Sequence, residues 1–308
     1  MAQKREPFKI VFAGLDNSGK TSIIYTLEDK FSMLNPAPTM GIERNSFEVL
    51  GFNVLTWDLG GQKQFRESYF EDERAFASTD LLFYIIDIQD RSHVGAAGEY
   101  FENILKKINQ LEERKPPIVL CFHKMDPDLR DNDRIISNIQ VAKQLFRRTA
   151  AGGGFDIEMF ETTIYEKWTL TAAFSKGLLK LSPKSKILDQ QLEELANQLQ
   201  SETVLLLDEN ALLFGQYFKT QDSFDVCQIV SPHLAIMADR INKYGTNFEV
   251  FQMKLREGGW VFFRDISIEN KRFYLVLYND QSESIKTMEK DLPPFIQQVS
   301  NTLQTFFI

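Results

Sequence analysis

The sequence predicts an α/β domain with a doubly wound, mostly parallel sheet, followed by a smaller α+β domain. The length of 308 residues favours two domains. Short apolar runs alternate with helical patterns over residues 8 to 181, which is typical of strands covered by helices on both faces. The polar, proline-containing segment Ser182–Lys186 indicates a linker, and the order of elements changes after it. We therefore expect domains of residues 1–182 and 183–308.

Apolar runs predict the strands of the first domain. They are Phe8–Ala13, Asn45–Leu50, Phe52–Asp58, Leu81–Asp87, Ile118–Phe122 and Phe155–Phe160. Gly51 separates the second and third runs, which predicts a hairpin. Apolar residues that recur every three or four positions predict the helices. These are Thr21–Phe31, Tyr100–Leu111, Ile135–Phe146 and Trp168–Leu181.

The second domain is predicted to read helix, two strands, helix, three strands and helix. The helices are Ile187–Leu199, Val226–Ile241 and Leu292–Phe306, and the strands are Thr203–Leu207, Ala211–Phe218, Phe248–Leu255, Trp260–Phe263 and Phe273–Tyr278. The segments Asp208–Asn210 and Gly258-Gly259 predict turns between paired strands. Pro232 is expected to kink the second helix or to delay its start. Pro293 and Pro294 are expected in the first turn of the last helix.

Composition excludes several classes of protein. The chain carries 35 basic and 43 acidic residues, a net charge of −8, which disfavours a nucleic-acid partner. Cys121 and Cys227 lie in apolar runs, so we expect reduced, buried thiols. No apolar run approaches the ~20 residues that span a bilayer, and the N-terminus lacks the apolar core of a signal peptide. We therefore expect a cytoplasmic protein that reaches a membrane only through a partner.

The strongest functional signal is Gly14–Thr21, which matches G-x-x-x-x-G-K-[ST] between a predicted strand and a predicted helix. In such a loop, inward-facing N–H groups surround phosphates, and a lysine places its charge between the β- and γ-phosphates. Lys20 is thus a candidate catalytic residue, and the Thr21 hydroxyl is a candidate Mg²⁺ ligand. The candidate nucleotide-binding residues here are Asp16, Asn17, Ser18, Gly19, Lys20, Thr21 and Ser22. The alternative is a chance glycine turn before a helix.

A second group of candidates follows the hairpin strand. Asp58 at a strand end can hold Mg²⁺ through water, Gly61 can offer an N–H to the γ-phosphate, and Gln62 can orient the attacking water. Thr39, in the loop before the hairpin, can complete the coordination of Mg²⁺. The alternatives are a solvated aspartate before a glycine turn and a proline-stiffened loop.

A third group lies past the later strands. In His123-Lys124-Met125-Asp126, the aspartate can accept hydrogen bonds from N1–H and N2–H₂ of guanine, a donor pair that adenine lacks. The stem of Lys124 can lie along the base, and His123 begins the motif. The backbone of Thr163 and Ile164 can contact the edge of the base, although a plain strand-to-helix turn explains these residues equally well.

These motifs resemble those of known GTPases. Gly14–Thr21, Pro38–Gly41 and Trp57–Gln62 resemble the Arf-like part of the Ras superfamily. His123–Asp126 and Phe160–Tyr165 are similar to the Rag/Gtr GTPases, in which histidine replaces the usual asparagine of the base motif. The predicted C-terminal element order resembles the roadblock/longin domain that Rag proteins carry.

The resemblance implies a P-loop GTPase domain followed by a roadblock/longin-like domain. It implies binding of GTP and GDP with Mg²⁺, slow intrinsic hydrolysis, and dimerisation through residues 183–308 with another Rag-like or roadblock-domain protein. GTPase-activating and exchange factors would regulate the switch, and a scaffold would bring it to a lysosome- or vacuole-like membrane. Gln62 resembles the glutamine of the Rag kind that retains it.

Two other functions stay open. The chain can be a non-hydrolysing assembly module in which bound nucleotide is structural, or, less favoured, a P-loop ATPase or kinase. No arginine is assignable as a catalytic finger. Arg44, Arg66 and Arg74 flank the segments around Thr39 and Gln62, and we expect solvated charges there.

Overall fold

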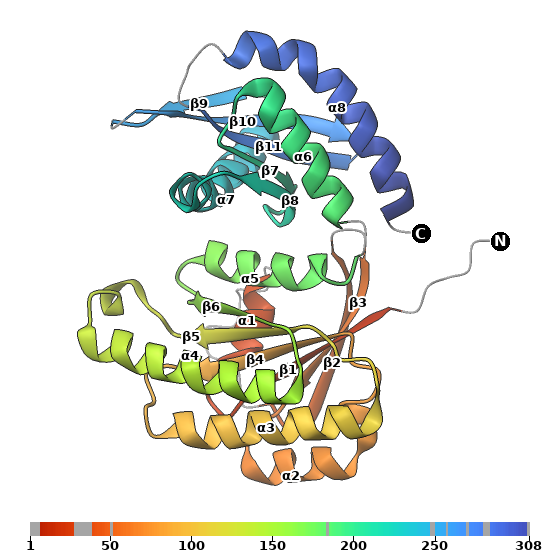
Figure 1. Ribbon diagram of the computed structural model, residues 1–308, viewed down its shortest axis with the longest axis vertical. Helices are drawn as coiled ribbons and strands as arrows, with labels where there is room; N and C mark the ends of the chain where they lie inside the picture. Colours follow the sequence, from red (N-terminus) through yellow and green to blue (C-terminus); the bar gives the residue numbers. More distant parts are fainter. Residues whose placement is uncertain are drawn as a thin grey trace, which may run out of the picture. The chain divides into compact units, whose positions relative to one another are not determined.

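The computed structural model describes residues 7–27, 39–49, 52–182, 185–246, 250–256, 258–268, 271–279 and 284–306. The chain divides into two compact units, Met1–Leu181 and Ser182–Ile308, which are described separately (Figure 1). The boundary predicted from the sequence, after residue 182, falls one residue later than this division. Among the described residues, no helix combines the length and apolar character needed to cross a membrane.

The first unit is built on a six-stranded sheet with the order β2-β3-β1-β4-β5-β6. Its strands are β1 (Phe8–Ala13), β2 (Ile42–Val49), β3 (Phe52–Leu59), β4 (Leu81–Asp87), β5 (Ile118–His123) and β6 (Ile157–Thr162). Only β2 runs antiparallel to its neighbour, so the predicted hairpin and the predicted mostly parallel sheet are both confirmed. Because the parallel strands end at the same edge, Asp87, His123 and Thr162 lie side by side in adjacent register positions.

Helices cover both faces of this sheet (Figure 1). They are α1 (Lys20–Leu27), α2 (Lys63–Glu71), α3 (His93–Leu111), α4 (Asp133–Gly153) and α5 (Lys167–Leu179), with single turns η1 (Glu73–Ala75) and η2 (Pro127–Leu129). On the α3 and α4 face, the ring of Tyr84 lies 4.9 Å from that of Phe101. On the α1 and α5 face, Phe83 lies 4.9 Å from Phe12 and 5.6 Å from Phe174. Each buried aromatic ring contributes about 1.5–3 kcal/mol, which holds the strand ends in place.

The sequence missed helix α2, because Tyr69 is its one buried residue and no apolar stripe marks it. Helix α3 begins at His93, earlier than predicted, where glycines and alanines weaken the periodic pattern. Strand β6 runs to Thr162, two residues beyond the predicted end. The predicted end of the first helix at Phe31 lies outside the described residues.

The second unit contains an antiparallel sheet with the order β8-β7-β11-β10-β9. Its elements are α6 (Ser185–Leu199), β7 (Thr203–Asp208), β8 (Leu213–Phe218), α7 (Gln221–Lys243), β9 (Val250–Lys254), β10 (Trp260–Ile268), β11 (Lys271–Asn279) and α8 (Ser284–Phe306). Helix α7 packs on one face of the sheet through Phe224, Cys227 and Ala235. Helices α6 and α8 lie together over the other face (Figure 1). This is the predicted α+β order.

Two helices of the second unit begin earlier than predicted. Helix α7 begins at Gln221, because the Thr220 hydroxyl caps the N–H of Ser223, and Pro232 lies inside the helix. Helix α8 begins at Ser284, so Pro293 and Pro294 occupy its interior and the expectation of a first-turn position was wrong. The predicted start of one strand at Phe248 lies outside the described residues. Both cysteines are free and buried, as expected.

Candidate active site

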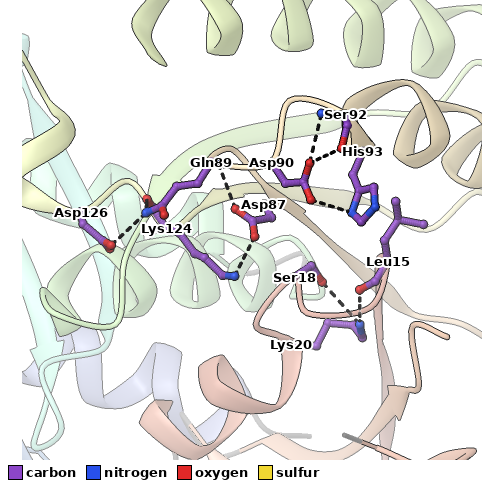
Figure 2. Close-up of polar contacts among 10 residues, drawn as sticks. All are labelled: Leu15, Ser18, Lys20, Asp87, Gln89, Asp90, Ser92, His93, Lys124 and Asp126. Carbon is purple, nitrogen blue, oxygen red and sulfur yellow. Dashed lines mark hydrogen bonds and ion pairs between the residues drawn. The ribbon is translucent and has the colours of Figure 1, made fainter. Parts of the chain in front are cut away.

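The phosphate-binding candidates form a tight loop between β1 and α1. A Cβ atom on Gly14 would lie 2.3 Å from the carbonyl oxygen of Ile85, so the loop starts in direct contact with β4. Lys20 is 5% exposed, and its Nζ donates to the carbonyl oxygen of Leu15 at 2.8 Å (Figure 2). It also donates to the carbonyl oxygen of Gly14 at 3.2 Å. Burial lowers the pKa of Lys20 to about 8, against the opposing charge of Asp58. The ammonium group is thus held inside the loop.

Three oxygen-bearing side chains meet beside this loop. Thr21 Oγ1 donates to Asp58 Oδ2 at 2.5 Å, and Thr39 Oγ1 donates to the same oxygen at 3.2 Å. The two hydroxyl oxygens lie 2.9 Å apart. Asp58 Oδ1 is buried without a hydrogen-bond partner, and burial raises the pKa of this carboxyl although the Thr21 hydroxyl opposes the shift. A cluster of hard oxygens with one orphaned carboxylate oxygen fits a small divalent cation such as Mg²⁺.

The segment after Asp58 is fastened to the two loops that precede it. Gly60 N donates to the carbonyl oxygen of Gly41 at 2.9 Å, and Tyr69 Oη on α2 donates to the same oxygen at 2.8 Å. A Cβ atom on Gly61 would lie 2.2 Å from the backbone of Leu15, so Gly61 rests on the phosphate-binding loop. The residues around Thr39, those around Gly61 and the loop of Lys20 therefore form one contact network.

Gln62 lies at the N-cap of α2. Its Oε1 accepts a hydrogen bond from Gln64 Nε2 at 3.3 Å, so the side chain is engaged within the start of the helix. Gln62 follows Gly61 directly, which places its backbone next to the loop that holds Lys20.

The base-recognition candidates meet at the ends of β5 and β6. Asp126 Oδ1 accepts from Thr163 Oγ1 at 2.6 Å, and Asp126 Oδ2 accepts from Gln89 Nε2 at 3.0 Å. The N–H of Thr163 donates to Thr169 Oγ1 at 3.1 Å, so the hydroxyl of Thr163 contacts Asp126 while its N–H is held by α5. Ile164 is exposed.

His123 links the base loop to the phosphate loop. Its Nδ1 lies 3.0 Å from Thr162 Oγ1, and a Cβ atom on Gly19 would lie 2.6 Å from its ring carbon Cδ2. Burial, together with the charge of Lys124, lowers the pKa of His123 to about 4, so the ring is neutral at pH 7. The imidazole at the start of the base loop therefore packs directly against Gly19 of the phosphate loop.

The arginines around the site have different surroundings. The guanidinium of Arg44 lies 3.9 Å from the centre of the Trp57 ring. Lys9 Nζ also lies 3.9 Å from the centre of this ring. Arg66 lies 5.0 Å from the ring of Tyr100, and its Nε is buried, so the expectation of a solvated charge was wrong for Arg66.

Arg74 is exposed and pairs with Asp72. The Nζ of Lys9 also donates to the carbonyl oxygens of Arg74 and Ala77, at 2.6 and 2.8 Å. Desolvation and the charge of Arg44 lower the pKa of Lys9 to about 8.

Comparison with known proteins gives the family. A sequence model described as the Gtr1/RagA G protein conserved region matches residues 9–243. The chain belongs to the Gtr1/RagA family of G proteins. It is 25% identical over 308 residues to Ras-related GTP-binding protein A of Dictyostelium discoideum, covering 95% of this chain and 99% of that protein.

This Gtr1/RagA protein also has Arf relatives over part of its length. It is 31% identical over 144 residues to ADP-ribosylation factor 1 of Brassica rapa subsp. pekinensis, covering 46% of this chain and 75% of that protein. A solved structure of the Arl6 BBS3 small GTPase from Trypanosoma brucei, with a bound nucleotide analogue, superposes with a TM-score of 0.47 at 20% identity. It covers 57% of this chain and 98% of that one.

Family membership makes this Gtr1/RagA protein a small GTPase that binds guanine nucleotide. The antiparallel sheet of the second unit, with helices on both faces, is consistent with a roadblock/longin-like domain. Sequence reasoning missed Asp87, Gln89 and Tyr69, which support the site from outside the motifs. Asp87 had one signal, its position at the end of a buried strand.

Proposed function

We propose that this protein is a Mg²⁺-dependent switch that binds GTP and GDP, hydrolyses GTP slowly and dimerises through its C-terminal unit. One observation carries the proposal: Thr21, Thr39 and Asp58 place oxygen atoms together beside the buried Lys20. At the other end, the His123 ring keeps the loop of Asp126 in contact with Gly19.

The residues of the chain divide the chemistry among them. Thr21, Thr39 and Asp58 would hold Mg²⁺, directly or through water, and a bound Mg²⁺ neutralises charge that develops on the phosphates. The Lys20 ammonium binds phosphate oxygens at the N-terminus of α1, where the helix dipole favours anions. Gln62 orients the water that attacks the terminal phosphate.

The contacts that already engage the arginines near the site support slow hydrolysis. Arg44 and Arg66 lie against aromatic rings, and Arg74 is paired with Asp72. An arginine supplied by an activating protein is typically worth about 10³–10⁵ in rate, so the isolated protein lacks this contribution.

The switch operates through the network around Gly41. A γ-phosphate that attracts Thr39 and the N–H of Gly61 pulls on two segments that already share the carbonyl oxygen of Gly41. The two segments therefore order together when GTP binds and relax together after hydrolysis.

In this proposal, a second protein binds the C-terminal unit to form the dimer. Helix α7 exposes Ile229, Ile236 and Met237, and β9 is an edge strand of its sheet. Another Rag-like or roadblock-domain protein, of the same or a different sequence, buries this face. Exchange and GTPase-activating factors act on the first unit, and a scaffold brings the cytoplasmic dimer to a lysosome- or vacuole-like membrane.

Nucleotide titration tests the binding part of the proposal. We expect labelled GDP and GTP to bind far more tightly than ATP, and binding to weaken when Mg²⁺ is chelated. Equal affinity for ATP would reject guanine recognition by Asp126. Sedimentation at increasing concentration, alone and with Rag-like partners, tests dimerisation, and a persistent monomer rejects it.

The alternative is a non-hydrolysing assembly module. The hydrogen bond from Gln64 to Gln62 Oε1 favours it, because this contact competes with acceptance of a hydrogen bond from the nucleophilic water. Single-turnover phosphate release separates the two functions: no release over hours, even with a partner present, favours the module.

A further inference from the structure

Gln89 lies in the loop between β4 and α3, outside every nucleotide-binding motif of the chain. Its Nε2 donates to Asp126 Oδ2 at 3.0 Å and to the carbonyl oxygen of Lys124 at 2.9 Å (Figure 2). Both hydrogens of the amide nitrogen are thereby used. We propose that Gln89 is a positioning residue for base recognition, which orients the carboxylate of Asp126 toward guanine.

The carboxylate of Asp126 is held on both oxygens. Gln89 donates to Oδ2, and Thr163 Oγ1 donates to Oδ1 at 2.6 Å. A carboxylate offers about four lone-pair sites, so one protein donor on each oxygen leaves each oxygen a site for the base. Rotation about the last side-chain bond of an aspartate is otherwise soft. Two fixed donors set the plane of the group, which a two-point contact with N1–H and N2–H₂ requires.

Asp87 holds Gln89 and Lys124 in place through hydrogen bonds to both. Its Oδ1 accepts from the N–H of Gln89 at 2.9 Å, and its Oδ2 accepts from Lys124 Nζ at 2.7 Å (Figure 2). Lys124 has a left-handed backbone with φ of 64°, a conformation that costs free energy in a non-glycine residue and needs such support. Gln89 therefore acts on the base through Asp126, while Lys20 and Thr21 act on the phosphates.

Inosine nucleotides show whether Gln89 orients the carboxylate of Asp126 or only supports the loop. Their base, hypoxanthine, keeps N1–H and lacks the N2 amino group. The variant Gln89→Leu removes the donor and keeps a side chain of similar bulk. A carboxylate that can turn loses the second of its two base contacts, and only guanine makes that contact. We expect the Kd for GDP to rise about tenfold and the Kd for IDP to rise about two- to threefold, so the preference for GDP over IDP falls.

The rate of GTP hydrolysis at saturation gives an independent readout. We expect kcat for Gln89→Leu to stay within about twofold of the unmodified protein, because the variant leaves Lys20 and Thr21 in place. Gln140→Leu, the same change on the exposed surface of α4, is the matched control and should alter neither affinity. Gln89→Asn keeps the amide one methylene short of Asp126, and should repeat the loss of preference if the leucine variant folds poorly.

Two results would overturn the proposal. An equal loss of GDP and IDP affinity means that Gln89 only supports the fold of the loop, and unchanged affinities mean that its contact with Asp126 is dispensable. The inference rests on the proposed reading of guanine by Asp126. If the unmodified protein binds GDP, IDP and ADP equally, that reading fails together with the role of Gln89, whereas a guanine preference that survives in Gln89→Leu refutes Gln89 alone.

Discussion

A single methyl group added at Gly61 should uncouple hydrolysis from nucleotide binding. The Cβ atom of alanine would lie 2.2 Å from the backbone of Leu15 and of Asp16, whereas ordinary contact begins at 3.4 Å. The two loops must therefore move apart by at least about 1.2 Å, the difference between these distances. A displacement of about 1 Å at a catalytic group typically costs about 10²-fold in rate. Because Gln62 follows Gly61 directly, we expect Gly61→Ala to hydrolyse GTP about 10²-fold more slowly.

Single-turnover phosphate release measures this loss, and titration with labelled GDP measures binding. The GDP affinity should change by less than about threefold, because GDP lacks the γ-phosphate to which the N–H of Gly61 would donate in the proposed function. Gly95→Ala is the matched control, since a Cβ atom on Gly95 in α3 has no neighbour within 4 Å. Hydrolysis by Gly61→Ala within threefold of the unmodified rate would refute the packing of Gly61 against the phosphate loop.

Three further changes test other parts of the site. Thr39→Val should raise the Mg²⁺ concentration needed to retain GTP by about tenfold or more, measured by nucleotide release in a magnesium series, and an unchanged midpoint would exclude Thr39 as a ligand. Gln62→Leu should bind GTP normally and release phosphate at least about tenfold more slowly. An unchanged rate of phosphate release would show that Gln62 does not orient the water. His123 has a folded pKa of about 4, below its ordinary value of 6.5, so the unfolded chain binds the proton first. The free energy of unfolding should therefore fall by up to about 3 kcal/mol as the pH falls from 6.5 to 4. Urea unfolding of His123→Gln over the same pH range should not show this loss.

The phosphate side of the site was predictable because its chemistry depends on short spacings in the chain. Gly14–Thr21 follows β1 and Asp58 lies near the end of β3, two strands whose apolar character is plain, and the geometry brings them together. Tyr69 was not predictable, since it lies on a helix with a mostly polar surface. Its contact with Gly41 depends on how α2 packs, which no local pattern encodes.

The base side shows a different limit. Asp126 was found from its motif, but Gln89 contacts it from the loop after the neighbouring strand, and Asp87 contacts Lys124. That neighbourhood follows from the strand order β1-β4-β5, a property of the folded sheet. In the second unit, Pro232 was expected to kink its helix or delay its start and Pro293 was expected in a first turn, because of their local cost, whereas both lie inside helices α7 and α8.

Trp57 gives the molecule an intrinsic optical reporter. Its indole is in contact with the cations of both Lys9 and Arg44, one residue before Asp58. Arg44 is carried by β2, the strand that continues directly from Thr39 and Gly41. Because nearby positive charge shifts indole emission, we expect displacement of this strand during nucleotide exchange to change fluorescence without any added label. Trp168 and Trp260 lie outside this cation pair, and Trp57 is therefore the indole that reports on β2.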